Sequence, residues 1–373
     1  NVAFYGGFAG TESSLGERDW AAHPTVIDGS ASRPGLRPGS RLPAHHVVEA
    51  ASGSRLDGFS VMGGIADGDG ETENGRGAGF YVAGASSAPT IAHCAFVGNS
   101  ATRGCGVAAI DSALSIADCQ FEAMDAAEAG GGVYSLGSTI TITSTTFVGN
   151  SAGAGGAVYA YDSVLSLEGC TLKENTATAG SAGALCVINC TDGGGPGIVM
   201  EACVLLDNNA ESWAGGVYSE ASTSEMTNVL LAGNQSGVSE YTGRLPAGAV
   251  YNREGSLDLV HCTFADNRAG SGAAVYMRAE DADASTTIRS SICWDAQGEE
   301  LYAYEPGGYT ATWDVTYSQV KGGFSGTGND DADPLFGHGD ALYYVLQADS
   351  PCKDSATGVY APPEDLLGLT RPR

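Results

Sequence analysis

Positive charge is scarce in this 373-residue chain. Only 17 residues are Lys or Arg, three of them Lys, against 44 Asp and Glu, so the net charge is -27. Nucleic acids and anionic membranes carry dense negative charge, and such a surface repels both. We therefore expect neither among the partners, and the acidic composition suits a secreted protein.

Long hydrophobic runs are also absent. No stretch approaches the ~20 apolar residues of a membrane helix, so the sequence predicts no transmembrane segment. No signal peptide is present, and the chain begins inside an apolar run, Val2 to Tyr5. We expect that a preceding segment has been removed, and that the protein is extracellular or at the cell surface.

Motifs for common chemistries are missing as well. The chain has ten Cys but no paired Cys-x-x-Cys motifs of the kind that hold zinc. No phosphate-binding, dinucleotide-binding or catalytic Ser motif stands in a suitable context. A polysaccharide lyase needs a basic residue at its site, and the basic residues here recur at no fixed position. The sequence thus names no catalytic residue, although 44 acids leave open a carboxylate pair of the glycosidase type.

The chain does contain a repeat. Seven times an aromatic residue or Leu is followed, three residues later, by a residue that is Asn in six copies. These fourth positions are 25 to 33 residues apart, a spacing typical of solenoids. They are Asn99, Met124, Asn150, Asn175, Asn208, Asn234 and Asn267.

Each copy holds three short apolar runs of period 2, such as Ala157 to Tyr159, Val164 to Leu167 and Cys170 to Leu172. Period 2 indicates β-strands rather than helices. The sequence therefore predicts an all-β parallel solenoid with three strands per rung and about 25 residues per rung.

Stacked rungs place equivalent residues about 4.8 Å apart, so each repeated position becomes a ladder. The Asn positions predict a ladder of hydrogen-bonded amides at a bend. A second, interior ladder follows Phe96, Phe121, Phe147, Leu172, Leu205, Leu231 and Phe264. Beside it a thiol-rich ladder is predicted at Cys94, Cys119, Thr145, Cys170, Cys203, Val229, Cys262 and Cys293.

Both ends of the chain depart from the repeat. We expect residues 1–42 to form an N-terminal cap, residues 43–298 to form the rungs, and residues 299–373 to form a C-terminal cap that is truncated. Caps are needed because the last rung at each end exposes unpaired strand edges.

Several segments resemble bacterial right-handed parallel β-helix repeat proteins of the cell surface or the secreted fraction. They are Phe4 to Glu12 with Arg18 to Trp20, Leu56 to Gly64, the Gly-Gly-Val-Tyr repeats, Asp333 to Phe336 and Leu346 to Cys352. The repeats are also similar to those of chlamydial polymorphic outer-membrane proteins. The resemblance implies a right-handed β-helix at the cell surface or outside the cell, and it implies no particular activity.

A column of tyrosines recurs one position after the core-facing Val of the Gly-rich strand. Its members are Tyr81, Tyr134, Tyr159, Tyr218, Tyr251 and Tyr276. Because neighbouring residues of a strand face opposite sides, these rings are predicted to face outward. An exposed stripe of Tyr would bind a glycan or a protein; alternatively, the rings only cover a Gly-rich sheet.

An acidic loop, Asp67 to Asn74, carries acids at every second position: Asp67, Asp69, Glu71 and Glu73. Alternating carboxylates are able to surround Ca²⁺ with oxygen ligands. The loop lacks the Gly and the final Glu of an EF-hand, so a solvated acidic loop is the alternative. Calcium is the one cofactor that the sequence suggests.

We infer from these patterns an extracellular, non-catalytic β-helix module for surface attachment, adhesion or assembly. Its expected partners are a cell-surface protein, a glycan or copies of itself, bound by the tyrosine flank or by the longer loops Val187 to Gly197 and Gln235 to Pro246. One alternative is a polysaccharide-active enzyme, a lyase or a glycoside hydrolase. A further alternative is a subunit stacked end to end in an extracellular filament.

Overall fold

The structure is a computed structural model that describes residues 2–34, 41–237, 246–295, 298–337, 344–353, 355–356 and 363–366. The chain divides into two compact units, Asn1–Cys186 and Val187–Arg373. Its helices are two short 3-10 turns, η1 (Leu15–Glu17) and η2 (Glu73–Gly75), among the residues described. None of the helices in this part of the chain has the length and apolarity needed to cross a membrane.

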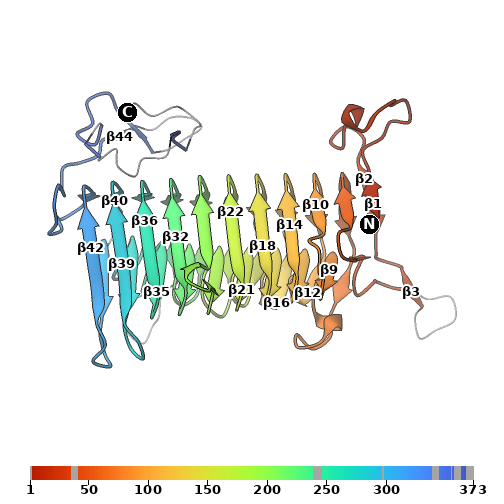
Figure 1. The fold of residues 1–373 in the computed structure, drawn as a ribbon, viewed down its shortest axis with the longest axis horizontal. Helices are drawn as coiled ribbons and strands as arrows, with labels where there is room; N and C mark the ends of the chain where they lie inside the picture. The colour runs from red at the N-terminus through yellow and green to blue at the C-terminus, as the bar shows by residue number, and fades with distance from the viewer. Residues whose placement is uncertain are drawn as a thin grey trace. The chain divides into compact units, whose positions relative to one another are not determined.

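Unit 1 consists of four parallel sheets (Figure 1). The first contains β1 (Ala3–Tyr5), β6 (Arg55–Asp57), β10 (Thr90–Ala92), β14 (Ala113–Ala117), β18 (Thr139–Thr143) and β22 (Val164–Glu168). The second contains β2 (Thr25–Asp28), β7 (Phe59–Met62), β11 (Ala95–Val97), β15 (Gln120–Glu122), β19 (Thr146–Val148) and β23 (Thr171–Lys173). The third contains β8 (Ile65–Ala66), β12 (Ser100–Arg103), β16 (Asp125–Ala129), β20 (Ser151–Ala152) and β24 (Thr176–Ala177). The fourth contains β5 (Val48–Glu49), β9 (Phe80–Ala83), β13 (Val107–Ile110), β17 (Val133–Leu136) and β21 (Val158–Tyr161). The unit boundary falls within β25 (Leu185–Ile188).

Unit 2 repeats this arrangement. Its first sheet contains β28 (Ile198–Glu201), β32 (Thr223–Thr227), β36 (Ser256–Val260), β39 (Ala284–Arg289) and β42 (Ala311–Thr316). The second contains β29 (Val204–Leu206), β33 (Leu230–Ala232), β37 (Thr263–Ala265), β40 (Ile292–Trp294) and β43 (Gln319–Val320). The third contains β30 (Asn209–Ala210) and β34 (Gln235–Ser236), and the fourth β31 (Val217–Glu220), β35 (Val250–Arg253), β38 (Val275–Arg278) and β41 (Leu301–Tyr304).

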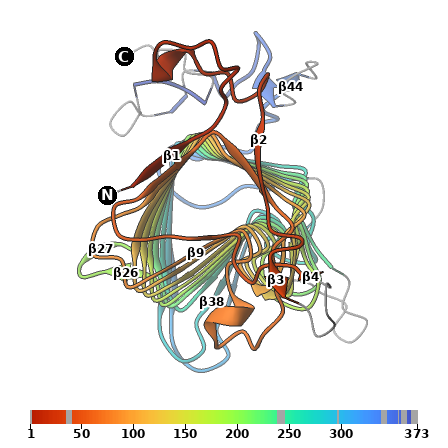
Figure 2. The same ribbon diagram turned by 90° about the vertical axis from the view of Figure 1, so that its right-hand side faces the viewer.

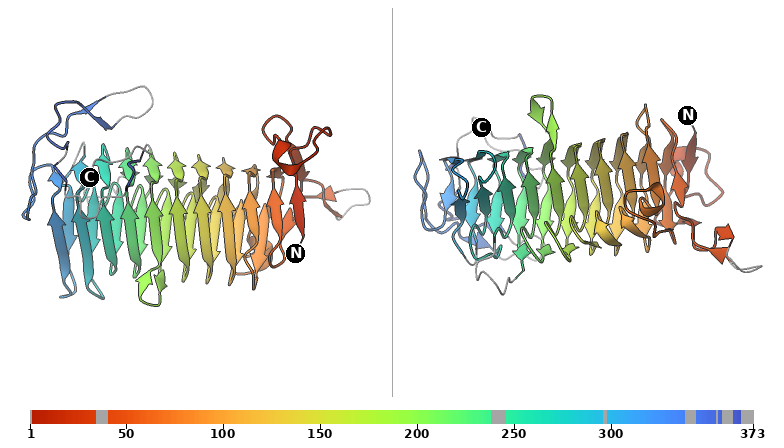
Figure 3. Two further views of the ribbon diagram at one scale, coloured as in Figure 1. Left: turned by 45° about the horizontal axis from the view of Figure 1, so that its top comes forward. Right: turned by 90° about the horizontal axis from the view of Figure 1, so that it is seen from below.

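Among the described residues, three antiparallel hairpins depart from the rungs. They are β3 (Arg33–Pro34) with β4 (Arg41–Leu42), β26 (Thr191–Asp192) with β27 (Gly195–Pro196), and β44 (Phe336–Gly337) with β45 (Val345–Leu346). The hairpin of β26 and β27 lies in the predicted loop Val187 to Gly197 and projects from unit 2 (Figure 3). In the other predicted loop, Gln235 to Pro246, residues 238–245 lie outside the described residues.

Strands of successive rungs pair residue for residue, which confirms the predicted parallel β-helix. Phe121 pairs with both Phe96 and Phe147, and the rings stack with centroids 4.9 and 4.7 Å apart. All three rings are fully buried, and burying a Phe side chain is worth roughly 1.5–3 kcal/mol. In Figure 2 the strands of unit 1 lie one behind another, as registered rungs require. The core is therefore a stripe of ladders inside the coil.

The predicted Asn ladder is confirmed in both units. In unit 1 the side-chain amide of Asn150 donates to Oδ1 of Asn175 at 2.9 Å. In unit 2 Asn208 donates to Asn234 at 2.9 Å, and Asn234 donates to Asn267 at 3.0 Å. All five side chains are buried, so these bonds satisfy polar groups that have no access to water.

A rung has one strand more than the sequence predicted. After Met124 and after every ladder Asn from Asn99 to Asn234, the chain forms a further strand of two to five residues, which belongs to the third sheet. In β20 only Ser151 and Ala152 are strand, with Ala152 buried. A run of two residues shows no recognisable alternation, and for this reason the pattern predicted a turn there.

The rungs also extend beyond the predicted boundaries. β1 and β2 pair in register with β6 and β7, although they lie in the predicted N-terminal cap. β41, β42 and β43 pair with β38, β39 and β40 from within the predicted C-terminal cap. The placement of Cys293 was wrong: it pairs with Phe264 and so continues the aromatic ladder, not the thiol ladder. The loops between strands differ in length from rung to rung, so the pairing of these strands and of Cys293 could not be aligned from the sequence.

Candidate functional site

The tyrosine column forms as predicted, but the exposure expected for it was wrong. The Val residues beside it face the core, and Tyr134 pairs with Tyr159 while Tyr251 pairs with Tyr218 and Tyr276. However, four of the six rings are buried: Tyr81, Tyr134, Tyr218 and Tyr251. Tyr159 and Tyr276 are half-buried. The column is therefore not an open stripe.

Stacking between rungs explains this burial. Ring centroids are 5.7 Å apart for Tyr134 and Tyr159, 5.2 Å for Tyr218 and Tyr251, and 5.0 Å for Tyr251 and Tyr276. Each ring thus covers the face of its neighbour. Tyr302 extends the column beyond Tyr276 at 5.1 Å. Its place in the column was not evident from the sequence, because Glu300 precedes Leu301-Tyr302, whereas Gly or Ala stands at that position in the other copies.

In unit 1 part of the column is open to solvent. A groove of about 400 Å³ is lined by Tyr134, Tyr159, Tyr161, Leu136, Ala129 and Ala154, with Glu71, Arg103 and Glu128 at its charged side. We call it the tyrosine groove. Aromatic and aliphatic side chains line most of the groove, and a few hydrogen-bonding groups lie beside them. This composition is usual for a ligand-binding site.

Arg103 organises the charged side of this groove. Its guanidinium forms ion pairs with Glu71 at 2.8 Å and with Glu128 at 2.7 Å. It donates to the hydroxyl of Tyr134 at 3.3 Å and lies over that ring, 5.6 Å from the centroid. Burial alone would lower the pKa of Arg103, but the bonds to Glu128 and Glu71 outweigh it and raise that pKa. Arg103 therefore stays charged.

The predicted calcium ligands lie on an exposed loop of unit 1. Asp67, Asp69, Glu71 and Glu73 are all exposed, and η2 begins at Glu73. Glu71 is paired with Arg76 and Arg103. In the described part of the chain, no three acids of this loop have carboxylate oxygens within 4.8 Å of one another. Calcium binding by the loop stays a prediction.

The described residues do contain one group of three converging carboxylates, in unit 2. It consists of Glu254, Glu280 and Asp281. The guanidinium of Arg253 lies among them, 3.3 Å from Glu254, 3.4 Å from Glu280 and 3.6 Å from Asp281. The arginine thus already supplies the positive charge that an ion would bring, and the group is an ion-pair cluster.

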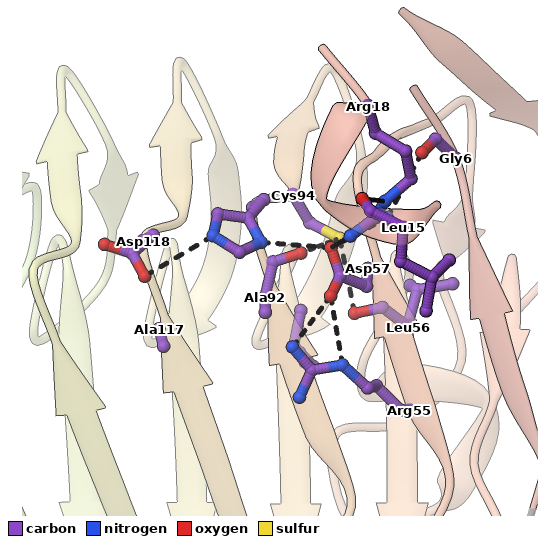
Figure 4. A network of polar contacts seen from close by, with 12 residues as sticks. Gly6, Leu15, Arg18, Arg55, Leu56, Asp57, Ala92, Cys94, Ala117 and Asp118 are labelled. Carbon is purple, nitrogen blue, oxygen red and sulfur yellow. Dashed lines mark hydrogen bonds and ion pairs between the residues drawn. The ribbon is translucent and has the colours of Figure 1, made fainter. Parts of the chain in front are cut away.

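A buried carboxylate, Asp57, forms a second polar centre in unit 1 (Figure 4). It is 1% exposed and lies at the end of β6. Arg18 donates to Oδ1 at 3.3 Å, Arg55 donates to Oδ2 at 2.7 Å, and Nδ1 of His93 lies 3.0 Å from Oδ1. Burial alone would raise the pKa of Asp57, but the bonds from Arg55, His93 and Arg18 hold it below its ordinary value.

His93 occupies a turn of the left-handed region, with φ of 50°. The same turn position carries Asp118 and Ser144 in the next rungs, at φ of 52° and 46°. This bend turns the imidazole outward, where Trp20 stacks on it at 3.9 Å. Arg18 and Trp20 thereby fix the N-terminal segment over this turn. The Asp57 centre could not be predicted from the sequence, because its members come from unrelated repeat positions.

A groove of about 410 Å³ opens beside this centre. Its polar lining comes from His93, Asp118, Gln120, Ser60, Ser144 and Thr146, and Trp20 closes one side. We call it the Trp20 groove. A larger cavity of about 450 Å³ lies in unit 2, between the equivalent turns at Asn228, His261, Ser290 and Tyr317 and the later residues Phe336, Tyr344, Leu346, Cys352 and Leu366.

Comparison with known families gives one result. A family model described as the right-handed beta helix region matches residues 78–264, which is half of the chain. No curated protein and no solved structure matches.

Proposed function

The chain belongs to the right-handed β-helix family, and from this premise we propose that it is an extracellular, non-catalytic module for surface attachment, adhesion or assembly. Its binding element in unit 1 is the tyrosine groove. The partner is a glycan or a protein of a cell surface.

One observation carries the proposal: three Tyr rings from neighbouring rungs converge on an open groove beside a fixed guanidinium. Tyr159 and Tyr161 are half-buried, so each keeps part of its ring accessible while β21 holds it in place. Rigid amphipathic rings bind with little loss of side-chain entropy, which makes them effective at interfaces.

The charges around the groove limit the ligand. Arg103 is neutralised by Glu71 and Glu128, and the whole chain carries a net charge of -27. An acidic polysaccharide or an acidic protein surface would therefore be repelled. We propose a ligand that is neutral or basic at the contact.

The acidic loop is the one place where we propose that Ca²⁺ binds. Ca²⁺ held by Asp67, Asp69 and Glu73 would order the loop, which carries Glu71 at the groove margin. Glu71 is engaged by two arginines, so we assign it to the groove rather than to the ion.

The experiment is a binding screen of the purified protein against immobilised neutral, basic and acidic glycans and against intact cells. Tyr159→Ala and Tyr161→Ala should each weaken binding roughly tenfold, since stacking contacts of this kind are worth about 0.5–1.5 kcal/mol beyond the area buried. Tyr309→Ala is the matched control, because Tyr309 is 44% exposed and lies outside the column. Binding that survives both groove variants would overturn the assignment to this groove.

A further inference from the structure

The Trp20 groove is separate from the tyrosine groove and shares no residue with it. It follows the outer face of the second sheet of unit 1, beside the turn that carries His93 and Asp118. Trp20 is 39% exposed although its ring stacks on His93. A large aromatic side chain is thus held at the groove with part of its surface in solvent.

The Asp57 centre fixes which imidazole nitrogen faces the groove. Asp57 is ionised, since its pKa lies below the ordinary value, and it can only accept hydrogen bonds. Nδ1 of His93, 3.0 Å away, must then carry the proton of the neutral imidazole. The other nitrogen, Nε2, is left as an acceptor.

Nε2 faces a second acceptor across a short gap. The distance from Nε2 to Oδ2 of Asp118 is 3.7 Å, which is longer than a hydrogen bond. Two acceptors at this distance have no proton to share, so a group that donates hydrogen bonds to both would complete the pair. Adjacent hydroxyls of a sugar are such a group.

Further polar groups continue along the sheet at the rung spacing of about 4.8 Å. Gln120 pairs in register with Thr146, and both side chains line the groove, as does Ser60. An extended chain with a hydroxyl-bearing unit at each step would meet one polar side chain per rung. The repeat of the fold is thereby matched to a repeating ligand.

The charges around the groove indicate whether an extended ligand bound there would be neutral or charged. No Lys or Arg is among the described residues that line the groove, and Arg18 and Arg55 of the adjoining Asp57 centre are bound to Asp57. Asp118 is 55% exposed at the groove and repels anions. A sugar acid would find no counter-charge there.

We propose that the Trp20 groove binds a neutral oligosaccharide, with Trp20 stacked on a sugar ring and with His93 Nε2 and Asp118 accepting hydrogen bonds from adjacent hydroxyls. The site acts independently of the tyrosine groove, and its presence does not depend on the function proposed above.

Tryptophan fluorescence tests this directly. The whole chain is titrated with neutral gluco-, manno-, galacto- and xylo-oligosaccharides, with oligogalacturonate as the acidic comparison. At least one neutral series should bind and change the emission, and oligogalacturonate should not. Trp20→Ala and Asp118→Asn, whose binding is measured by isothermal titration calorimetry, should each lower the affinity roughly tenfold, the effect of losing about 1.4 kcal/mol. Trp213→Ala is the matched control, because Trp213 is also 39% exposed but lies in unit 2.

Thermal unfolding separates loss of binding from loss of structure. The melting temperature of Asp118→Asn should stay close to that of the unmodified chain, because Asp118 is 55% exposed. Absence of binding to every neutral series, or equal binding in Trp20→Ala and Asp118→Asn, would overturn the proposal. Loss of binding in Tyr159→Ala alone would do the same, since it would place the sugar in the tyrosine groove.

Discussion

Replacement of Asp295 by Asn should stabilise unit 2 at neutral pH. Asp295 occupies the last position of the Asn ladder, is 1% exposed, and accepts hydrogen bonds at 2.8 Å from the backbone and side-chain amides of Asn267. Its second oxygen, Oδ2, has no hydrogen-bond partner, and neither has Oε2 of the buried Glu300 beside it. Burial, reinforced by the charge of Glu300, raises the pKa of Asp295.

The ladder itself indicates what an amide would do there. Nδ2 of Asn234 donates to the carbonyl of Leu205, and Nδ2 of Asn267 donates to that of Leu231. By the same pattern an amide at position 295 would donate to the carbonyl of Phe264 and would remove the repulsion from Glu300. Satisfying a buried polar group is worth roughly 1–3 kcal/mol.

The gain should depend on pH in a defined direction. A raised native pKa means that Asp295 favours folding in its protonated form, so its contribution is complete below the ordinary pKa of about 4 and is lost as the pH rises through the native pKa. Protonated Asp295 also offers an O–H in the place of the amide donor. The advantage of Asp295→Asn should therefore be large at pH 8 and small at pH 4.

Thermal unfolding of the whole chain at these two pH values measures the effect. A gain of 1 kcal/mol in a unit of this size raises the melting temperature by about 2–4 °C. Asp192→Asn, which makes the same change of charge on the exposed hairpin, is the control and should shift melting little. Equal or lower melting of Asp295→Asn at pH 8, or the same gain at both pH values, would refute the reasoning.

Four other outcomes are expected. Asn150→Ala and Asn175→Ala should each lower the stability of unit 1 by roughly 1–3 kcal/mol in denaturant unfolding, because buried amide and carbonyl groups lose their partners; unchanged unfolding in both would exclude an energetic role for the ladder. Asp57→Asn should cost about 3 kcal/mol at pH 7 by stranding two guanidinium groups, and, since the pKa of Asp57 is lowered, the difference from the unmodified chain should shrink below about pH 4. Ca²⁺ should raise the melting temperature by mass action, and Asp67→Asn combined with Asp69→Asn should abolish that rise, whereas equal melting with ion and with chelator leaves only a solvated loop. Pectin and alginate should yield no new unsaturated or reducing ends on incubation; sustained cleavage that one carboxylate substitution removes would favour the enzyme alternative.

The repeat made the strands and ladders predictable. Alternation of period 2 assigns each side chain to the inside or outside of the coil, and stacking of equal rungs then places Phe121 on Phe96 whatever lies elsewhere in the chain. The Asn ladder follows from the same logic, because one short turn recurs at each bend. These features depend on local sequence and on its period, and both are visible in the chain itself.

The third sheet and the pairing of Cys293 could be determined only from the structure. The strands of the third sheet are as short as two residues, too short to show a period. The loops between copies vary in length, so the repeat pattern predicted Cys293 opposite Cys262, two positions away from its true partner Phe264. Only the hydrogen-bonded register of neighbouring rungs settles such shifts.

The candidate sites depended on tertiary structure still more. The alternation in the strand predicted that the tyrosine rings face away from the core. Their burial, however, depends on the ring of the next rung and on Arg103, which lies 31 positions before Tyr134. The Asp57 centre joins Arg18, Arg55 and His93, which share no repeat position and no motif. Period and propensity act along the chain, whereas a buried charge is stabilised by whichever partners the folded chain brings within hydrogen-bonding distance. That is why the chain alone determined its ladders, and only the folded coil decided where its ionised groups and open grooves lie.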